Sequence, residues 1–383
     1  EDESVTEAPS GNGGKTEEGS GEGAETGGLS WNERSVTECL PLAYAECFSA
    51  DHYGDDYTLL SVMDDERFLI AEEGAPVPSG LPDDITVLKK PFSRIYLASS
   101  SAMDFFLRLS AEDMISMTST KAEDWSLPAA KELVEAGDIL YVGKYNAPDY
   151  ERLIERDCDL AIENTMIYHN PETKELIEKL EIPVLVERSS YEKHPLGRME
   201  WIKVYGLLCG KEEEAGKFFS EATEKLDQML SAGDPAAGSA ERPKTAFFYI
   251  TAGGLYNIRR PGDYITKMIG LAGGEYVFDT IVSEAGNASS SMNVTAEEFY
   301  ERAREADILI YNSTVEGELF ALSDLLAKDP LLADYKAVRE GNVWCTEKNM
   351  FQEITGTADM IGDLALLMNG RAEDDLRFIH RLQ

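Results

Sequence analysis

Near the middle of the chain, residues 212–230 have the sequence EEEAGKFFSEATEKLDQML. Its apolar residues recur at the spacing of one helix face, at positions 215, 218, 219, 222, 226, 229 and 230. Glycines flank the run at Gly210 and Gly233. At a rise of about 1.5 Å per residue, such a helix spans roughly 28 Å, enough to run alongside two lobes. The stretch therefore predicts one long helix that links two parts of the protein.

On both sides of this helix, short apolar runs alternate with predicted helices. Three of these runs directly follow an aspartate, at Asp138, Asp159 and Asp307. Such runs are typical of strands that are buried on both faces of a parallel sheet. Their recurrence on both sides of the linking helix indicates two α/β lobes of related design. The second lobe is predicted to begin with a strand at Lys244–Thr251 and to end with a helix at Ala358–Met368.

The first part of the chain has a different pattern. Residues 35 to about 90 predict a β segment with strands at Thr37–Phe48, Tyr57–Val62 and Arg67–Ala71. Residues 1–30 are rich in Gly, Glu, Ser and Thr, and we expect a disordered tether there, held by a lipid-modified residue upstream of Glu1. The predicted fold is α/β: a first lobe at 31–210, a linking helix at 211–231 and a second lobe at 232–383.

The composition excludes several functions. Acidic residues outnumber basic ones by 72 to 35, and the net charge is −37. A nucleic-acid partner or an anionic membrane surface would require a surplus of Lys and Arg, so neither is expected. The five cysteines form no C-x-x-C pair and are expected to be buried apolar residues: Cys39, Cys47, Cys158, Cys209 and Cys345. No apolar run is long enough to predict a membrane-spanning helix.

The segment ERSSYEKHPLGRMEWIK at residues 187–203 follows a predicted strand, Pro183–Val186, and leads into a helix. Ligands of open α/β sheets bind at the carboxyl ends of strands, so this loop is expected to touch a ligand. With the aspartate-led strands and the linking helix, it resembles the binding proteins of ABC importers for ferric siderophores, haem and cobalamin. The resemblance extends from about Tyr44 to Leu367.

The resemblance implies a monomeric extracytoplasmic protein that captures an iron complex or a corrinoid and delivers it to a permease with its ATPase. It implies no catalysis, no cofactor and no metal site built by the protein. The chain would lie on the outer face of the cell membrane through a lipid anchor, or in the periplasm. It also implies that one acidic residue of each lobe pairs with permease arginines, and Glu151 and Glu297 match these positions. The helix dipole also favours acids there, and Asp149 and Glu298 are the alternatives.

Candidate ligand contacts are the polar and aromatic residues that follow predicted strands. Arginine pairs bidentately with carboxylates, and tyrosine covers the flat face of a chelate, so we select Ser100, Tyr168, Tyr191, Arg198, Tyr256, Arg259 and Arg260. The arginines could instead pair with neighbouring acids. His169 and His194 are alternative iron ligands for haem, although loop histidines are commonly solvated. Trp201 is expected in the core.

Two functions of other classes remain open. A two-lobed tetrapyrrole metal chelatase would share this outline, and so would a receptor subunit that binds a ligand and signals to a partner. The sequence contains no serine nucleophile elbow, no H-E-x-x-H and no glycine-rich nucleotide loop. These motifs would have favoured an enzyme.

Overall fold

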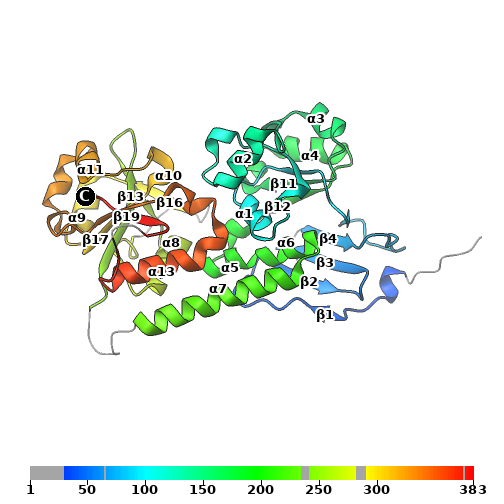
Figure 1. The fold of residues 1–383 in the computed structure, drawn as a ribbon, viewed down its shortest axis with the longest axis horizontal. Helices are drawn as coiled ribbons and strands as arrows, with labels where there is room; N and C mark the ends of the chain where they lie inside the picture. The colour runs from blue at the N-terminus through cyan, green and yellow to red at the C-terminus, as the bar shows by residue number, and fades with distance from the viewer. Residues whose placement is uncertain (1–29, 64–65, 234–240, 282–289, 374–375) are drawn as a thin grey trace, which may run out of the picture.

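A long helix, α7 (Glu212–Gly233), runs along the base of two α/β lobes in the computed structural model (Figure 1). The structure describes residues 30–63, 66–233, 241–281, 290–373 and 376–383. The predicted tether falls outside these ranges except for Ser30. The two lobes and the single linking helix confirm the predicted fold class.

Helix α7 contacts both lobes through its apolar face. Ala215 and Phe219 are buried near α6 (Ile202–Cys209) of the first lobe, and the distal half packs against α13 (Thr357–Met368). A Cβ atom at Gly206 of α6 would lie 2.7 Å from the Ala215 Cβ, so only glycine permits this close crossing. Each lobe therefore has a helix fixed to α7.

The first lobe has a five-stranded parallel sheet in the order β12-β11-β6-β7-β8. Helices connect consecutive strands of this sheet, and a small hairpin, β9–β10, lies between β8 and α3. The elements are β6 (Ile95–Leu97), α1 (Ala102–Arg108), β7 (Ile115–Thr118), α2 (Pro128–Ala136), β8 (Leu140–Tyr141), β9 (Gly143–Lys144), β10 (Ala147–Pro148), α3 (Tyr150–Glu155), β11 (Leu160–Asn164), α4 (Pro171–Lys179), β12 (Val184–Glu187) and α5 (Pro195–Glu200).

A second, N-terminal sheet packs below this lobe. Its strands lie in chain order: β1 (Glu38–Cys39), β2 (Phe48–His52), β3 (Tyr57–Val62), β4 (Glu66–Ala71) and β5 (Ile85–Lys89). The predicted strand Thr37–Phe48 is wrong, because residues 40–47 form a loop. The amides of residues 43–47 in this loop donate to side-chain carboxylates rather than to a neighbouring strand. The predicted strand Tyr57–Val62 is confirmed.

The second lobe has a mixed sheet in the order β16-β14-β13-β17-β18-β19, with β15 beside β13. Its centre, β13–β17–β18, is parallel, and the pairs at both edges are antiparallel. The elements are β13 (Lys244–Ile250), β14 (Tyr256–Arg259), α8 (Tyr264–Leu271), β15 (Glu275–Tyr276), β16 (Ser291–Val294), α9 (Ala296–Ala303), β17 (Ile308–Tyr311), α10 (Ser313–Glu316), α11 (Leu322–Lys328), α12 (Lys336–Arg339), β18 (Val343–Thr346) and β19 (Ile379–Arg381).

The repeated aspartate has the same role in both lobes. The Asp159 carboxylate accepts from the Ser93 and Arg94 amides, at 2.8 and 3.0 Å, where the chain enters β6. Asp307 accepts from the Lys244 amide at 2.7 Å, at the start of β13. Asp159 and Asp307 therefore each bind the amino end of a parallel neighbouring strand. Asp138 precedes β8, a two-residue edge strand that is only half-buried, so the expectation of a strand buried on both faces is wrong there.

The cysteines only partly follow expectation. All five are free thiols. Cys47 and Cys345 are buried, Cys158 and Cys209 are half-buried, and Cys39 is exposed, so the expectation is wrong for Cys39, which lies on the short edge strand β1. Trp201 is fully buried, as predicted. Among the described residues, no helix combines the length and apolar character that a bilayer crossing needs.

Candidate functional site

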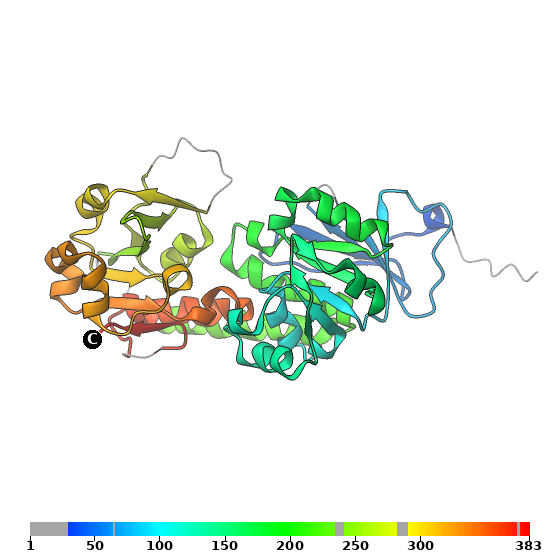
Figure 2. The same cartoon turned by 90° about the horizontal axis from the view of Figure 1, so that it is seen from above.

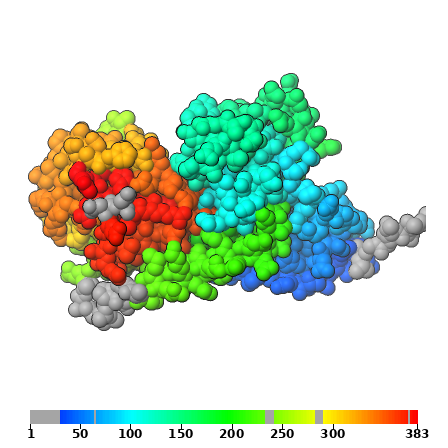
Figure 3. All heavy atoms as spheres, viewed as in Figure 1, coloured from blue at the N-terminus to red at the C-terminus, as the bar shows by residue number. Residues whose placement is uncertain are grey.

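The two lobes meet at the carboxyl ends of their central strands. The Ser126 amide, beyond β7, donates to the Gln352 side chain, beyond β18, at 2.7 Å. The Thr355 amide donates to the buried Asp104 carboxylate of α1, also at 2.7 Å. The surface above this junction is notched between the lobes (Figure 3), and the view from above shows the lobes on either side of it (Figure 2). This is the edge where ligands of open α/β sheets bind.

The floor of the junction is an arginine–tyrosine cluster drawn from both lobes. The Arg198 guanidinium, on α5, lies 3.8 Å from the ring centroid of Tyr264, the first residue of α8. Arg259, at the end of β14, lies 6.0 Å from the same ring and 5.1 Å from that of Phe351. A stacked guanidinium keeps its edge free for hydrogen bonds. The structure thus brings two predicted arginines, far apart in sequence, to one aromatic ring.

Asp263 supplies negative charge to this floor. Its carboxylate lies 3.9 Å from the Arg259 guanidinium and caps α8 by accepting from the Ile265 amide at 2.9 Å. Burial raises the pKa of Asp263, although the charges of Arg259 and Arg198 pull it down. Burial also raises the pKa of the Tyr264 hydroxyl, which stays neutral. The sequence reasoning missed both residues; the signal was Pro261-Gly262-Asp263, a helix start directly after the arginines.

Exposed apolar side chains follow strand ends in both lobes. In the first lobe they lie beyond β11 and β12, and in the second beyond β13 and β17: Met166, Tyr168, Tyr191, Leu255, Val315 and Phe320. Phe320 is 69% exposed and stacks on His380 with a centroid distance of 5.6 Å. Large exposed apolar side chains that follow the carboxyl ends of strands in both lobes are typical of a surface that receives an apolar ligand.

The remaining predicted contacts lie in different surroundings. Ser100 is half-buried in the loop after β6. Tyr168 and Tyr191 are exposed on the first-lobe side, and Arg188 lies over the Tyr168 ring at 5.0 Å. The Arg260 side chain donates to the Ser291 carbonyl at 3.1 Å within the second lobe.

Tyr256 does not belong to the cleft surface. It is 1% exposed, its ring stacks on Phe299 at 4.2 Å, and its hydroxyl donates to Asp329 at 2.6 Å. The physical reason is the alternation of β14, which directs Tyr256 and Ile258 into the core. The prediction of Tyr256 as a ligand contact is therefore corrected to a core residue.

Most of the segment 187–203 holds the N-terminal loop rather than a ligand. The buried Glu200 carboxylate accepts from the amides of Ala43, Tyr44 and Ala45, with distances of 2.7 to 3.1 Å. It also accepts from Lys203 at 2.7 Å. Three consecutive amides on one carboxylate form a strong anion-binding arrangement.

Glu192 continues this arrangement. It accepts from the amides of Glu46 and Cys47 and from the Trp201 indole, at 2.8 to 2.9 Å. A Cβ at Gly197 would lie 2.9 Å from the Tyr44 carbonyl oxygen, so the loop passes too close for any other residue. The segment is thus mainly a structural lock, and Tyr191 and Arg198 are its residues at the cleft.

The two candidate histidines have structural or solvent-exposed positions. The His194 ring stacks on Tyr44 at 4.6 Å and accepts from the Leu196 amide at the start of α5. Burial lowers its pKa, which keeps the ring neutral. His169 is exposed at the end of a 3₁₀ turn. Within the described ranges, no three His, Cys, Asp or Glu side chains are grouped to hold a metal ion.

Glu151 and Glu297 occupy the same place in two corresponding helices. Each is the second residue of a helix, α3 or α9, that precedes an aspartate-led strand, and each is exposed. Asp149 caps α3 by accepting from the Arg152 amide at 3.1 Å. Glu298 is half-buried. The alternative acids are therefore less available than Glu151 and Glu297.

Comparison with known proteins gives consistent results. The chain is 24% identical over 321 residues to an uncharacterised lipoprotein of Methanocaldococcus jannaschii, covering 80% of this chain and 73% of that protein. A periplasmic haem-binding protein from Pseudomonas aeruginosa has the same fold, with a TM-score of 0.57, 14% identity, and coverage of 76% of this chain and 98% of that one. A periplasmic vitamin B12-binding protein of Vibrio cholerae aligns with a TM-score of 0.51 and 13% identity over 73% of this chain and 97% of that one.

The family signature covers both lobes. The sequence profile of the periplasmic binding proteins matches residues 95–349, from β6 to the segment beyond β18. This range contains the linking helix, the locked segment and the arginine–tyrosine floor, and it leaves out the N-terminal sheet. The chain therefore belongs to the periplasmic binding protein family.

Proposed function

We propose that this protein is the extracytoplasmic solute-binding component of an ABC importer and that it captures an iron complex, a ferric siderophore or haem. The observation that carries the proposal is the cluster at the junction of the lobes, where Arg198 and Arg259 both lie near the ring of Tyr264. An arginine edge binds an anionic group of a chelate, while tyrosine and the rim cover its flat face. Binding and delivery need no chemistry from the protein.

Delivery would use Glu151 and Glu297. Their matched exposed positions on α3 and α9 suit pairing with arginines of a permease, one from each lobe. The chain would work at the outer face of the membrane through a lipid anchor, which the description of one relative as a lipoprotein supports, or in the periplasm.

A corrinoid is the second candidate ligand, because the floor arginines already have partners. Arg259 lies near Asp263 and donates to the Ser290 hydroxyl at 3.2 Å, and Arg198 rests on Tyr264. A ligand carboxylate must compete with Asp263 for Arg259, whereas an uncharged amide need not. This observation favours a complex with few peripheral charges.

The binding test is a titration of the purified chain with haemin, a ferric catecholate siderophore, ferrichrome and cyanocobalamin, followed by visible absorbance. One of these complexes should bind at one-to-one stoichiometry without turnover. Arg198→Ala should then weaken that complex about ten- to a hundredfold, as expected for a lost charge-assisted hydrogen bond. Arg302→Ala, at an exposed position of α9, is the matched control, and Arg260→Ala tests the remaining predicted arginine contact. Absence of binding by all four complexes contradicts the proposal.

The delivery test uses the importer in lipid vesicles. Glu151→Ala with Glu297→Ala should keep the ligand affinity and abolish stimulation of the ATPase. Asp149→Ala with Glu298→Ala is the control pair and should retain most stimulation. Full uptake by the first pair would rule out these residues as the docking contacts.

A further inference from the structure

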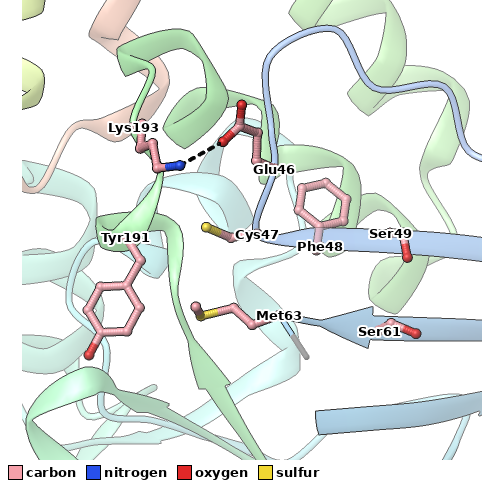
Figure 4. Close-up of a pocket in the computed structure, with 8 residues that line it drawn as sticks. All are labelled: Glu46, Cys47, Phe48, Ser49, Ser61, Met63, Tyr191 and Lys193. Atoms are coloured by element: carbon pink, nitrogen blue, oxygen red, sulfur yellow. Dashed lines mark hydrogen bonds and ion pairs between the residues drawn. The ribbon is translucent and has the colours of Figure 1, made fainter. Parts of the chain in front are cut away.

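A pocket of about 420 Å³ lies between the N-terminal sheet and the loop that follows β12. Figure 4 shows Met63 and Cys47, from the ends of β3 and β2, directed toward the loop that carries Tyr191 and Lys193. The sheet contributes the wall and the loop contributes the opposite side. Residues 46–63 of this wall lie outside the segment that matches the family. The pocket is thus built in part from a region that the family signature does not include.

The pocket and the carboxyl edge of the first-lobe sheet share a residue. Tyr191 belongs to both, since it follows β12 and is 46% exposed. The end of the N-terminal sheet reaches the same rim, because Glu66 of β4 lies 3.4 Å from the guanidinium of Arg188, which lies over the Tyr168 ring. The second lobe also approaches, since Lys267 of α8 donates to the Lys193 carbonyl. A large ligand on the floor can therefore extend into the pocket.

The pocket is lined by polar and apolar groups without a net charge. Glu46 and Lys193 form an ion pair at 3.5 Å across its edge. Ser49 and Ser61 are direct partners on neighbouring strands and present two hydroxyls. Met63 is 42% exposed and supplies an apolar thioether. These groups hydrogen-bond and cover an uncharged arm, and they offer no unpaired cation to a carboxylate.

The Cys47 thiol adds no charge to the lining of this pocket. Burial, together with the charge of Glu192, raises its pKa to about 12, so the thiol stays protonated at neutral pH. The pocket thus binds by shape and hydrogen bonding alone.

We propose that this pocket receives an uncharged, amide- or hydroxyl-bearing arm of the captured metal complex, and so selects ligands with a neutral periphery over those that carry carboxylates. The proposal rests on the proposed function of the cleft. It deepens that function by assigning specificity to the N-terminal sheet, with Ser61 and Met63 as specificity-determining residues.

The test compares ferrichrome and cyanocobalamin, both with an amide-rich periphery, with haemin, which carries two carboxylates. Ser61→Trp fills the pocket and should weaken the uncharged complex that the parent binds by at least about tenfold. Thr86→Trp places the same side chain on an exposed site of β5 and is the matched control, expected to stay within about threefold. Thermal unfolding of both variants reports whether they fold.

Met63→Asn is a second variant that leaves the backbone unstrained. Met63 has a φ of 52°, in the left-handed region that asparagine tolerates well, so the change removes the apolar contact without a conformational cost. It should weaken the uncharged complex about fivefold.

Three outcomes separate the two proposals. If Arg198→Ala weakens an uncharged complex while Ser61→Trp and Met63→Asn leave it within about threefold, the pocket is wrong and the cleft stands. If haemin alone binds, the proposed preference for ligands with a neutral periphery is wrong, and the proposed binding of an iron complex in the cleft is retained. If none of the three complexes binds and a ferric catecholate does not bind either, the proposed function and this inference both fall.

Discussion

The interiors of the two lobes are built with different chemistry. The first lobe buries four glutamates to 4% exposure or less: Glu163, Glu187, Glu192 and Glu200. The core of the second lobe is instead a stack of aromatic rings, in which Phe299 contacts Phe248, Tyr256 and Phe278 at centroid distances of 4.2 to 5.3 Å. A buried carboxylate is stable only with donors or a proton, whereas a ring needs only packing. The stability supplied by the buried glutamates of the first lobe should therefore depend on pH and on backbone contacts, and that supplied by the Phe299 stack of the second lobe should depend on shape.

The largest effect is expected from the lock of the N-terminal loop. Glu200→Ala leaves three amides without their acceptor and removes the carboxylate partner of Lys203, and should lower the free energy of unfolding by about 5 kcal/mol. Urea unfolding measures this loss, and Glu213→Ala, an exposed change on α7, is the control. A loss as small as that of the control would mean that the lock contributes little to stability.

The corresponding change in the second lobe removes a ring from the stack. Phe299→Ala should cost about 4 kcal/mol, from lost burial and the cavity left behind. Because no charge is involved, the cost should be equal at about pH 5 and about pH 8 in urea unfolding. If the loss of stability depended strongly on pH, the expected difference between the Phe299 stack and the buried glutamates of the first lobe would be contradicted.

Glu163 should give the first lobe a pH-dependent stability. Its carboxylate oxygens have no hydrogen-bond partner among the described residues, and burial raises its pKa to about 8 from 4.5. Between these values the folded protein keeps a proton that the unfolded chain has released, so stability falls as pH rises. From about pH 5 to about pH 7.5 the loss should be about 3 kcal/mol.

Glu163→Gln removes the titrating group and so isolates its contribution. Urea unfolding of the parent and the variant at both pH values should show that the variant lacks this part of the slope. Equal slopes in the two proteins would show that Glu163 is ionised in the folded state.

The smallest loss of stability is expected from the aspartate-to-amide contact that both lobes contain. Burial is the largest single influence on the pKa of Asp307, and it raises this pKa. The hydrogen bonds from Lys336 and from the Lys244 amide act in the opposite direction, and the net effect is a lowered pKa. A lowered pKa stabilises the fold above the unfolded value and is lost as pH falls. Asp307→Asn should cost about 2 kcal/mol at neutral pH, in line with a charged hydrogen bond, and progressively less toward about pH 3.

Asp159→Asn is the matched change in the first lobe. It interrupts the same aspartate-to-amide contact at the start of β6 and should also destabilise, by about 1–3 kcal/mol. If one substitution lowers the free energy of unfolding and the other does not, the aspartate-to-amide contact does not stabilise the two lobes equally.

The sequence by itself determined the elements whose pattern is local. The spacing of apolar residues in 212–230 predicts a helix, and α7 begins at the predicted Glu212 and ends at Gly233. The buried strands after Asp159 and Asp307 were also predictable, since a fully apolar run of four or five residues has few other stable arrangements. The sequence was also sufficient for the two-lobed fold and for placing Arg198 after a strand, whereas Arg259 proved to be the last residue of β14, a strand that was not predicted.

The tertiary structure alone decided what those residues contact. Ala43 and Glu200 are 157 residues apart, and nothing near either of them signals that one binds the other, so the loop 40–47 was predicted as a strand. Tyr256 had the sequence context of a ligand contact, but the pleat of β14 directs it into the core. Arg198 and Arg259 both approach Tyr264, across the junction of two lobes. Local periodicity sets which elements form, whereas contacts between distant carboxylates, amides and rings depend on how those elements pack.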